Sequence, residues 1–532
     1  MDGEKLDRAK YILAMYDIRG KQEFIYKSSK IKEIAGASYI IRDCFKDCLY
    51  PAAKEGQSKG IFSYKENGEE DFTPEDFERH LREGYIGEVI YDGGGNFFVL
   101  YKDIESYRQV NRRFYRKLLE KTYSLQVLTS YIDEIHFDNY RNDQKELYRE
   151  HRKREQAEST LYPVNTLPIV QTDYRTSLPL ARLQRIGKRE EKVSYESKKK
   201  YEKYEKIDKT QSEERQIKGS KLLDEMITEK GEESLLAVVY IDGNNMGAQV
   251  ERCLEGKKTY EECIKALRKF SAEIQKHYIE DRIHDVDCLL DKKPEEKKGR
   301  RFVVYAGDEV TFICNARDAY ALAKEYLEKL AEGSPEGEPR TSCAGIAIFH
   351  SHAPFPEAYR IAEECCESGK QLMKKGEMRY ASLMDFHYCQ GAFGVSLEEI
   401  RREEGTEESS RPWFAKYMER QGKEENTGLI KGNYISCESA ERMAEMLSRI
   451  GRGNIKTLAF SARKNPADFR TELERIKAHQ REKGLDFSLG GILDEEMQQK
   501  LIYDIALVYD LWFDPEKQKE DLREQRTEQA ET

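Results

Sequence analysis

Hydrophobic and polar positions repeat in the same order in two parts of the chain, and the second part is the clearer. It contains RFVVYAGDEVTFIC (301–314), in which two β-branched apolar runs flank a short polar break. This pattern predicts two strands joined by a tight turn. The elements expected around it are strand, helix, hairpin, helix, strand and helix, at 235–241, 259–281, 301–314, 316–332, 341–349 and 356–375.

The first part shows the same order with a less regular pattern. Its expected strand, helix, hairpin, helix, strand and final charged helix lie at 10–17, 28–48, 88–101, 103–121, 123–135 and 140–158. Strand, helix, hairpin, helix and strand form the order of a ferredoxin-like palm. We therefore predict an α+β protein with two tandem palms of the polymerase and nucleotidyl cyclase type, which arose by duplication.

The two hairpins differ in their acidic residues. Aligning the copies places Asp17 at the position of Asp242, and Gly94-Gly95-Asn96-Phe97 at the position of Ala306-Gly307-Asp308-Glu309. On this alignment the first copy keeps the turn and loses both hairpin carboxylates. We predict a degenerate first palm and a second palm that retains an acidic site.

The pattern changes between and after the palms. Residues 161–183 carry three prolines and are expected to be irregular or extended, and the mixed-charge run at 188–206 predicts a solvated helix face. The remainder, about 395–513, is expected to be mainly helical. The predicted domains are a first palm (1–160), a connector (161–234), a second palm (235–390), a helical C-terminal domain (391–515) and a polar tail (516–532).

Composition narrows the class of function. Of the 532 residues 36% are charged and the net charge is −10, which excludes a uniformly basic nucleic-acid coat. An RNA contact must therefore be local. The basic clusters VNRRFYRK (110–117) and KKGRR (297–301) are candidates, the first if its arginines line a groove with an aromatic residue.

The lengths of the apolar runs and the pattern of cysteines indicate the cellular compartment that is expected for the protein. No apolar run approaches the roughly 18 residues of a membrane span, so no membrane partner is expected. The eleven cysteines form no CxxC pair. This argues against a zinc ribbon and favours a reduced, cytoplasmic protein in which cysteines are small core residues.

Three carboxylates are the strongest candidates for chemistry. Asp242 ends the strand at 235–241, and Asp308 and Glu309 lie at the hairpin. The first strand and the hairpin are neighbours in a palm, so these acidic groups are expected to converge. Converging carboxylates repel unless a cation lies between them, and hard oxygen ligands suit Mg²⁺ or Mn²⁺.

Other residues near these carboxylates are candidates for nucleotide binding. The loop after Asp242 leads into a helix, and its backbone N–H groups are suited to phosphates. Lys370, in the last palm helix, is suited to the β- and γ-phosphates. The expected contacts are Gly243, Asn244, Asn245, Met246, Gly247, Gly307, Ser342 and Lys370. His350 and His352 follow the last strand, either as a metal pair or beside a base.

Four motifs resemble one family. YDIRGKQEFIYKSSKIKEIAGASYII, YIDGNNMG, YAGDEVTF and SCAGIAIFHSHAPFPEAYRIAEECCESGK look like the large, palm-bearing subunit of type III CRISPR effectors (Cas ten, also called the Cmr second subunit). The resemblance covers both palms, roughly 10–135 and 235–390. The hairpin is also similar to that of diguanylate cyclases (GGDEF-like).

The resemblance implies a function. In that family two palms bind two ATP molecules, and the second palm joins ATP into cyclic oligoadenylate, a messenger of antiviral defence. It implies that Asp242, Asp308 and Glu309 hold metal ions while the 3′-hydroxyl of one nucleotide attacks the α-phosphate of the other. RNA and other CRISPR effector subunits are the implied partners.

The chain also departs from the family. The usual hairpin is Gly-Gly-Asp-Asp, where this chain has Ala306-Gly307-Asp308-Glu309, and Asn244 stands where the family often has a further Asp. Neither an HD nuclease domain nor a zinc-binding insert is expected, which suggests a compact two-palm relative. Three hypotheses follow: a nucleotidyltransferase or cyclase using ATP, a catalytically weak nucleotide- or RNA-binding scaffold, and a GTP-using cyclase. The last would need a homodimer, which the duplicated palm makes unnecessary.

Overall fold

The structure is a computed structural model that describes most of the chain. The described residues are 11–28, 30–68, 71–93, 95–133, 135, 137–157, 169–186, 189–211, 234–291, 300–334, 340–374, 378, 380–389, 391, 394–405, 409–417, 430–431, 434–482 and 495–514. Contacts divide the chain into two compact units that alternate along the sequence. The first unit comprises Met1–Gln216, Asn245–Lys276 and Ala306–Asp308, and the second comprises Ile217–Asn244, His277–Tyr305 and Glu309–Thr532.

The first palm is built on a five-stranded sheet with the order β2-β3-β4-β1-β5. Its strands are β1 Ile12–Arg19, β2 Ile61–Phe62, β3 Gly87–Gly93, β4 Asn96–Tyr101 and β5 Gln126–Ile132. Its helices are α1 Lys21–Tyr26, α2 Ile31–Arg42, α3 Tyr50–Lys54, α4 Tyr64–Asn67, α5 Pro74–Arg82, α6 Ile104–Thr122 and α7 Tyr140–Ala157, with a π-helical turn at Phe45–Leu49. The helix α6 begins where Asp103 accepts a hydrogen bond from Ser106 N, which is an N-cap.

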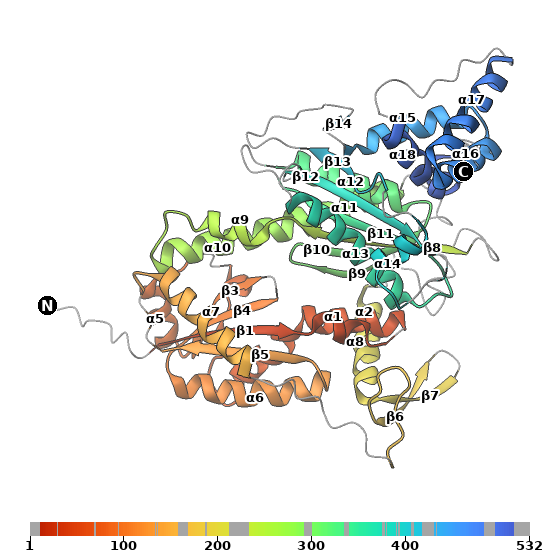
Figure 1. Cartoon of the computed structure of the whole chain (residues 1–532). Coiled ribbons are helices and arrows are strands. Elements are labelled where there is room, and N and C mark those ends of the chain that lie inside the picture. Colours follow the sequence, from red (N-terminus) through yellow and green to blue (C-terminus); the bar gives the residue numbers. More distant parts are fainter. Residues whose placement is uncertain are drawn as a thin grey trace, which may run out of the picture. The chain divides into compact units, whose positions relative to one another are not determined.

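The second palm has a six-stranded sheet with the order β13-β12-β11-β8-β10-β9. Its strands are β8 Leu235–Gly243, β9 Arg300–Ala306, β10 Glu309–Asn315, β11 Ser342–His350, β12 Ala381–Tyr388 and β13 Trp413–Tyr417. Its helices are α11 Asp281–Asp291, α12 Ala319–Glu332, α13 Phe355–Lys374 and α14 Leu397–Glu403 (Figure 1).

Both sheets contain the same four-strand arrangement. β5-β1-β4-β3 in the first palm corresponds to β11-β8-β10-β9 in the second, with the first strand of each copy between the fourth and the third. This is the ferredoxin-like order, so the predicted α+β fold with two tandem palms is confirmed.

The strand register corrects the predicted alignment of the two hairpins. Asp17 on β1 pairs with Asn96 on β4, whereas Asp242 on β8 pairs with Glu309 on β10. The counterpart of Glu309 is therefore Asn96, not Phe97, and the predicted alignment is wrong by one residue. The error arises because glycines in the first turn allow several alignments, and only strand pairing fixes the register.

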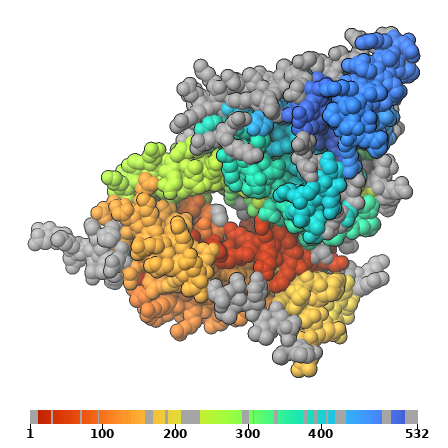
Figure 2. All heavy atoms as spheres, viewed as in Figure 1, coloured from red at the N-terminus to blue at the C-terminus, as the bar shows by residue number. Residues whose placement is uncertain are grey.

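A segment that follows β8 in sequence belongs to the first unit. It holds α9 Met246–Cys253 and α10 Tyr260–Ile274. Tyr260, Cys263 and Leu267 of α10 share one hydrophobic core with side chains of the first palm, and Figure 2 shows this segment in yellow-green against the orange first palm. The predicted helix at 259–281 is thus divided, because it passes at Gln275–Glu280 through a π-helical turn into α11.

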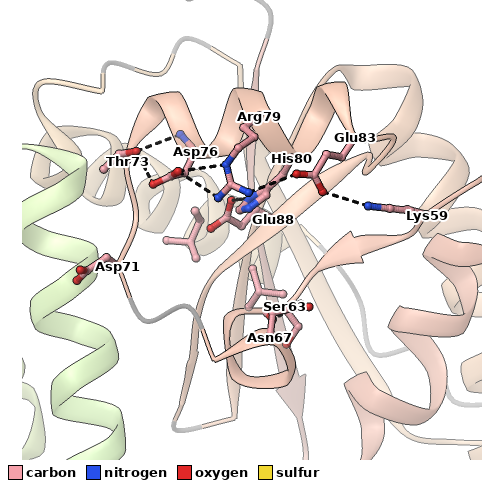
Figure 3. A network of polar contacts seen from close by, with 12 residues as sticks. Lys59, Ser63, Asn67, Asp71, Thr73, Asp76, Arg79, His80, Glu83 and Glu88 are labelled. Atoms are coloured by element: carbon pink, nitrogen blue, oxygen red, sulfur yellow. Dashed lines mark hydrogen bonds and ion pairs between the residues drawn. The ribbon is translucent and has the colours of Figure 1, made fainter.

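Arg268 anchors α10 to the first palm. Its guanidinium is buried and donates hydrogen bonds to the carbonyls of Val89 and Ile90 at 2.7 and 3.1 Å. It also pairs with the buried Glu88 carboxylate at 3.1 Å. Glu88 in turn contacts His80 Nδ1 at 2.9 Å, as part of the polar network around α5 (Figure 3).

Among its described residues, the predicted connector contains a two-stranded sheet and one helix, all in the first unit. These are β6 Leu180–Ile186, β7 Arg189–Ser194 and α8 Tyr195–Gln211. The prediction of a solvated helix face at 188–206 is wrong, because Glu196 and Lys200 of α8 are fully buried. They pair with each other at 2.6 Å where α8 packs on α2, and a Cβ at Gly36 would lie 1.9 Å from the Lys200 carbonyl oxygen.

The C-terminal part of the second unit is largely helical, as predicted. It holds α15 Cys437–Ser448, α16 Arg452–Lys464, α17 Pro466–Glu482, α18 Glu495–Val508 and a π-helical turn at Tyr509–Phe513. This part also holds three short strands among its described residues: the edge strand β13, which begins at Trp413, β14 Ile430–Lys431 and β15 Tyr434–Ile435. Arg411 pairs with Asp504 of α18 at 3.0 Å, and this joins the helices to the palm. The predicted polar tail lies outside the described residues.

Two further sequence predictions concern membranes and cysteines. Among the described helices, none has the length and apolar character that crossing a bilayer requires. All eleven cysteines are free thiols and most are buried, as expected for small core residues.

Candidate functional site

Two of the predicted carboxylates face each other across neighbouring strands. Asp242 is the penultimate residue of β8, Glu309 is the first residue of β10, and the two residues are directly paired. Paired residues on antiparallel strands project to the same face of a sheet, with Cβ atoms about 5 Å apart. The sequence prediction that these two residues converge is therefore confirmed.

A buried tyrosine lies on the same face. Tyr240, two residues before Asp242, contacts the ring of Tyr359 edge-on with centroids 5.5 Å apart. Burial, followed by the negative charges of Glu309 and Asp242, raises the pKa of the Tyr240 hydroxyl. The hydroxyl therefore stays protonated at neutral pH.

The helix α13 brings one polar side chain to each carboxylate. Tyr359 donates a hydrogen bond to Glu309 Oε1 at 3.4 Å, and Lys370 forms an ion pair with Asp242 Oδ2. The two residues are eleven positions apart, which is about three helical turns, so they share one face of the helix. Tyr359 is a site residue that sequence analysis missed, although this spacing from Lys370 was available as a signal.

A glycine on β11 allows α13 to lie this close to the sheet. A Cβ at Gly345 would lie 1.8 Å from the carbonyl oxygen of Ala362, so no other residue fits without moving the helix. Gly345 pairs with Tyr240 on β8. The position of Lys370 and Tyr359 over the strand ends therefore depends on direct contact between helix and sheet.

The charges at the site are partly compensated. Burial alone would lower the pKa of the Lys370 ammonium, but the Asp242 carboxylate outweighs burial and raises it. Lys370 and Asp242 are 18% and 25% exposed, so water reaches the pair. Glu309 on the paired strand adds a second carboxylate to this face, and hard oxygen donors of this kind suit a divalent cation.

The hairpin turn consists of two residues. Ala306 ends β9 in extended backbone, and Gly307 and Asp308 form the turn, with Gly307 at a φ of +67°. Glu309 is thus a paired strand residue and not part of the tip. Only glycine readily adopts this φ. Ala306, which stands where the family usually has a glycine, lies in the strand and not at the position with positive φ, so alanine fits there.

The loop after Asp242 is shorter than predicted. Asn244 is buried, and its side chain donates to Thr341 Oγ1 at 3.1 Å and to the Ala381 carbonyl at 3.3 Å. Asn245 follows with a φ of +57°, and α9 begins at Met246. Asn244 therefore holds the ends of three strands together, and its role as a phosphate contact stays a prediction.

Ser342 is buried in the protein, whereas Gly247 of the loop is exposed. Ser342 is fully buried and pairs with Gly243 at the start of β11. A Cβ at Gly247 would meet no atom within 4 Å, so this position is open. The structure thus brings Asp242, Glu309 and Lys370 together, and it places the Ser342 side chain in the interior.

The histidine pair gains no further ligand. The rings of His350 and His352 lie 5.3 Å apart. Within the part of the chain that the structure describes, no three or more His, Cys, Asp or Glu side chains form a group that could hold a metal ion. A metal ion at Asp242 and Glu309 would therefore need oxygen atoms from water or a bound phosphate to complete its shell.

Several residues of the candidate RNA contact on α6 make contacts within the first unit, and RNA binding there stays a prediction. Phe114 is buried in the core, Tyr115 donates to the Val127 carbonyl at 2.9 Å, and Arg116 and Lys117 pair with Glu55 at 2.6 and 2.9 Å. These basic residues are therefore engaged within the first unit. In the second cluster, residues 297–299 lie outside the described residues.

The strand-end aspartate of the first palm has a different environment. Asp17 Oδ2 lies 3.0 Å from Arg19 Nη1 and 3.3 Å from His151 Nε2, and His151 Nδ1 shares a 2.9 Å hydrogen bond with Ser130. Burial alone would raise the pKa of Asp17, but hydrogen bonds from His151 and Arg19 outweigh it and lower the pKa. The Asp17 carboxylate is therefore ionised and satisfied by protein groups.

Comparisons with known proteins agree with the sequence resemblance. Residues 235–379 match the family described as "Cas10/Cmr2, second palm domain". The solved structure described as "Crystal structure of apo Csm1-Csm4 cassette" is similar at 13% identity and a TM-score of 0.47, covering 94% of this chain and 71% of that chain. The same cassette "in complex with AMPPNP" is similar at 12% identity and a TM-score of 0.47, with the same coverage. No curated protein matches the chain.

Proposed function

The chain carries a Cas10-like palm, and from this premise we propose that its second palm is a metal-dependent nucleotidyltransferase that joins ATP into an oligoadenylate, cyclic in the family. The observation that carries the proposal is the direct pairing of Asp242 with Glu309 at the ends of β8 and β10. The family match covers both strands and α13, and the chain retains an acid at each of the paired positions.

The donor set at this site fits Mg²⁺ or Mn²⁺. Mg²⁺ is commonly bound by one or two carboxylates together with substrate phosphates, and Asp242 and Glu309 supply two hard oxygen donors on one face of the sheet. Asp308, the third carboxylate predicted from the sequence, precedes Glu309 in the turn, but within the described residues it does not complete a three-residue ligand group with Asp242 and Glu309, so water or phosphate oxygens would fill the remaining positions. When bound, the ion would neutralise the triphosphate and the leaving pyrophosphate.

The protein groups then have separate roles. Asp242 and Glu309 hold the cation, and Tyr359 orients the Glu309 carboxylate through its hydrogen bond. Gly247, with open space around it, lets a phosphate approach the start of α9. In the reaction, the bond from the 3′-oxygen of one ATP to the α-phosphorus of another forms as the bond to pyrophosphate breaks, and the hydroxyl proton is released to solvent.

A second candidate is a nucleotide- or RNA-binding scaffold in a defence complex with other CRISPR effector subunits. Two observations favour it. Lys370 forms an ion pair with Asp242, and no third protein ligand joins Asp242 and Glu309 within the described residues. Such a palm would bind a metal–nucleotide complex and release no pyrophosphate.

Product analysis by mass spectrometry separates the two candidates. The protein would be incubated with each of the four nucleoside triphosphates and Mg²⁺ or Mn²⁺, beside the variants Asp242→Asn and Glu309→Gln. Glu367→Gln is the matched control, because this carboxylate is also on α13, is about half exposed and pairs with Lys374 at 3.1 Å. The enzyme is supported if oligoadenylate and pyrophosphate form with the wild type and Glu367→Gln, and if both site variants lose at least about a hundredfold.

The scaffold is supported by a different result. ATP binding that requires a divalent cation, is lost in Asp242→Asn and is accompanied by no product would favour it. Oligoadenylate formation that survives in both site variants would contradict the assignment of this site to the chemistry.

A further inference from the structure

We infer that Lys370 is a displaceable counter-ion: it forms an ion pair with Asp242, a divalent cation must displace it from that carboxylate, and the released ammonium then binds the triphosphate. This inference rests on the proposed metal–nucleotide site and adds the order in which its ligands bind. It makes Lys370 a group that couples metal binding to nucleotide binding.

The first step of the argument is that Lys370 and a metal ion would compete for the same oxygen atoms. Lys370 Nζ is hydrogen-bonded to Asp242 Oδ2, and the same carboxylate is the strand-end ligand of the proposed site. An ammonium and a divalent cation cannot both lie against this carboxylate without strong repulsion. Glu309 lies on the neighbouring strand β10 and accepts a hydrogen bond from Tyr359 of α13, and its second carboxylate favours the doubly charged ion.

The second step concerns what moves. The helix α13 is fixed to the sheet by the contact at Gly345 and to α14 by a hydrogen bond from Leu397 N to the Glu364 carboxylate. A shift of the whole helix would break both contacts. The Lys370 side chain has four rotatable bonds and is partly exposed, so it can change partner while the helix stays in place.

The third step is a comparison within the chain. In each palm a basic side chain from the helix after the fourth strand reaches the strand-end aspartate: His151 of α7 reaches Asp17, and Lys370 of α13 reaches Asp242. The first pair is reinforced by Arg19 and by Ser130, and no carboxylate stands opposite Asp17. In the second palm, by contrast, a flexible lysine lies beside an aspartate that has a second carboxylate opposite it. Displacement of the lysine by a metal ion requires both features.

Two consequences follow for binding. If Lys370 occupies Asp242 in about nine molecules of ten, the apparent affinity for a metal ion alone is about tenfold lower than that of the free carboxylates. Once displaced, the ammonium is available to the β- and γ-phosphates. Metal binding then raises the affinity for ATP through Lys370, in addition to the ion's own contact with the phosphates.

The test is a titration of the full chain with Mn²⁺ in the absence of nucleotide, with free Mn²⁺ measured by electron paramagnetic resonance. Lys370→Met and Lys370→Gln are expected to bind Mn²⁺ about tenfold more tightly than the wild type. Lys370→Arg, which keeps the competing charge, should stay within about twofold. Lys374→Met is the control, because Lys374 lies one turn further along α13, is 65% exposed and pairs with Glu367.

A second measurement follows ATP binding with and without Mn²⁺. The gain in ATP affinity on adding Mn²⁺ should be several-fold smaller in Lys370→Met than in Lys374→Met. Using two neutral variants guards against one that folds poorly, and the Mn²⁺ titration of Asp242→Asn identifies the site.

The inference is overturned if neither neutral variant binds Mn²⁺ more tightly than the wild type, or if no form of the protein binds Mn²⁺ at Asp242. Failure of the proposed function is a separate result. It would appear as a wild type that releases no pyrophosphate while the Mn²⁺ titration still distinguishes Lys370→Met from Lys374→Met.

Discussion

The two palms share one strand order, yet their strand-end aspartates have opposite surroundings. In the first palm Asp17 is satisfied by Arg19 and His151, and Asn96 stands opposite it. In the second palm Asp242 has a flexible lysine beside it and Glu309 opposite. The fold is thus the same with and without a second strand-end acid, because the sheet depends on packing, while the proposed chemistry would depend on a few residues at the strand ends.

The palms also differ in how their cores are completed. The first palm is completed by α10, whose sequence lies between two strands of the second palm. The second palm is completed by α13 and by the C-terminal helices, through contacts such as Trp512 Nε1 to the Ala316 carbonyl at 2.8 Å. A repeat in sequence thus need not correspond to a repeat in packing.

The largest expected effect tests this difference in packing. Arg268→Met would leave Glu88 buried with its main counter-charge removed, and we expect the first unit to lose about 3–5 kcal/mol of stability. Hydrogen exchange of peptides from β3 and β4, read by mass spectrometry, measures this loss. The fluorescence of Trp413 and Trp512, which both belong to the second unit, should change less.

Lys265→Met is the control for that experiment. Lys265 is on the same helix and pairs with Asp71 at 2.8 Å, but both side chains are about two-thirds exposed. Exposed pairs contribute little, so we expect less than about 1 kcal/mol. Equal losses in the two variants would show that α10 is not anchored through Arg268.

A smaller effect tests the assignment of a structural role to Asp17. Asp17→Asn should cost about 1–3 kcal/mol and leave pyrophosphate release unchanged, in contrast to Asp242→Asn. The folded pKa of Asp17 is lowered, so the carboxylate stabilises the protein above about pH 4, and this contribution is lost as the pH falls through the folded pKa. Unfolding by urea at several pH values, followed by circular dichroism, should show a weaker acid dependence in the variant. Loss of product formation in Asp17→Asn would place the first palm in the chemistry.

A further test concerns the second unit in acid. Burial, together with Arg411 and Arg401, lowers the pKa of His387 to about 3. The unfolded chain takes up this proton near pH 6.5 and the folded chain does not, so stability falls by roughly 1.4 kcal/mol per pH unit below about pH 6. His387→Asn should reduce this slope in urea unfolding followed by tryptophan fluorescence. An unchanged slope would show that another group controls the acid sensitivity.

Local patterns in the sequence were sufficient for the strand order, both hairpins and the positions of Asp242 and Glu309. Alternation of side chains and the residues that turns require act over a few positions, so they can be read without the rest of the fold. The long helices α6, α7 and α13 were predicted to within a few residues for the same reason.

Tertiary structure alone decided the remaining features. Strand pairing places Asn96 opposite Asp17. The close contact of α8 with α2 at Gly36 buries Lys200. A shared hydrophobic core assigns α10 to the first unit. The pair between Lys370 and Asp242 joins residues 128 positions apart. Such contacts arise from how helices pack on sheets, and no short stretch of sequence contains both partners.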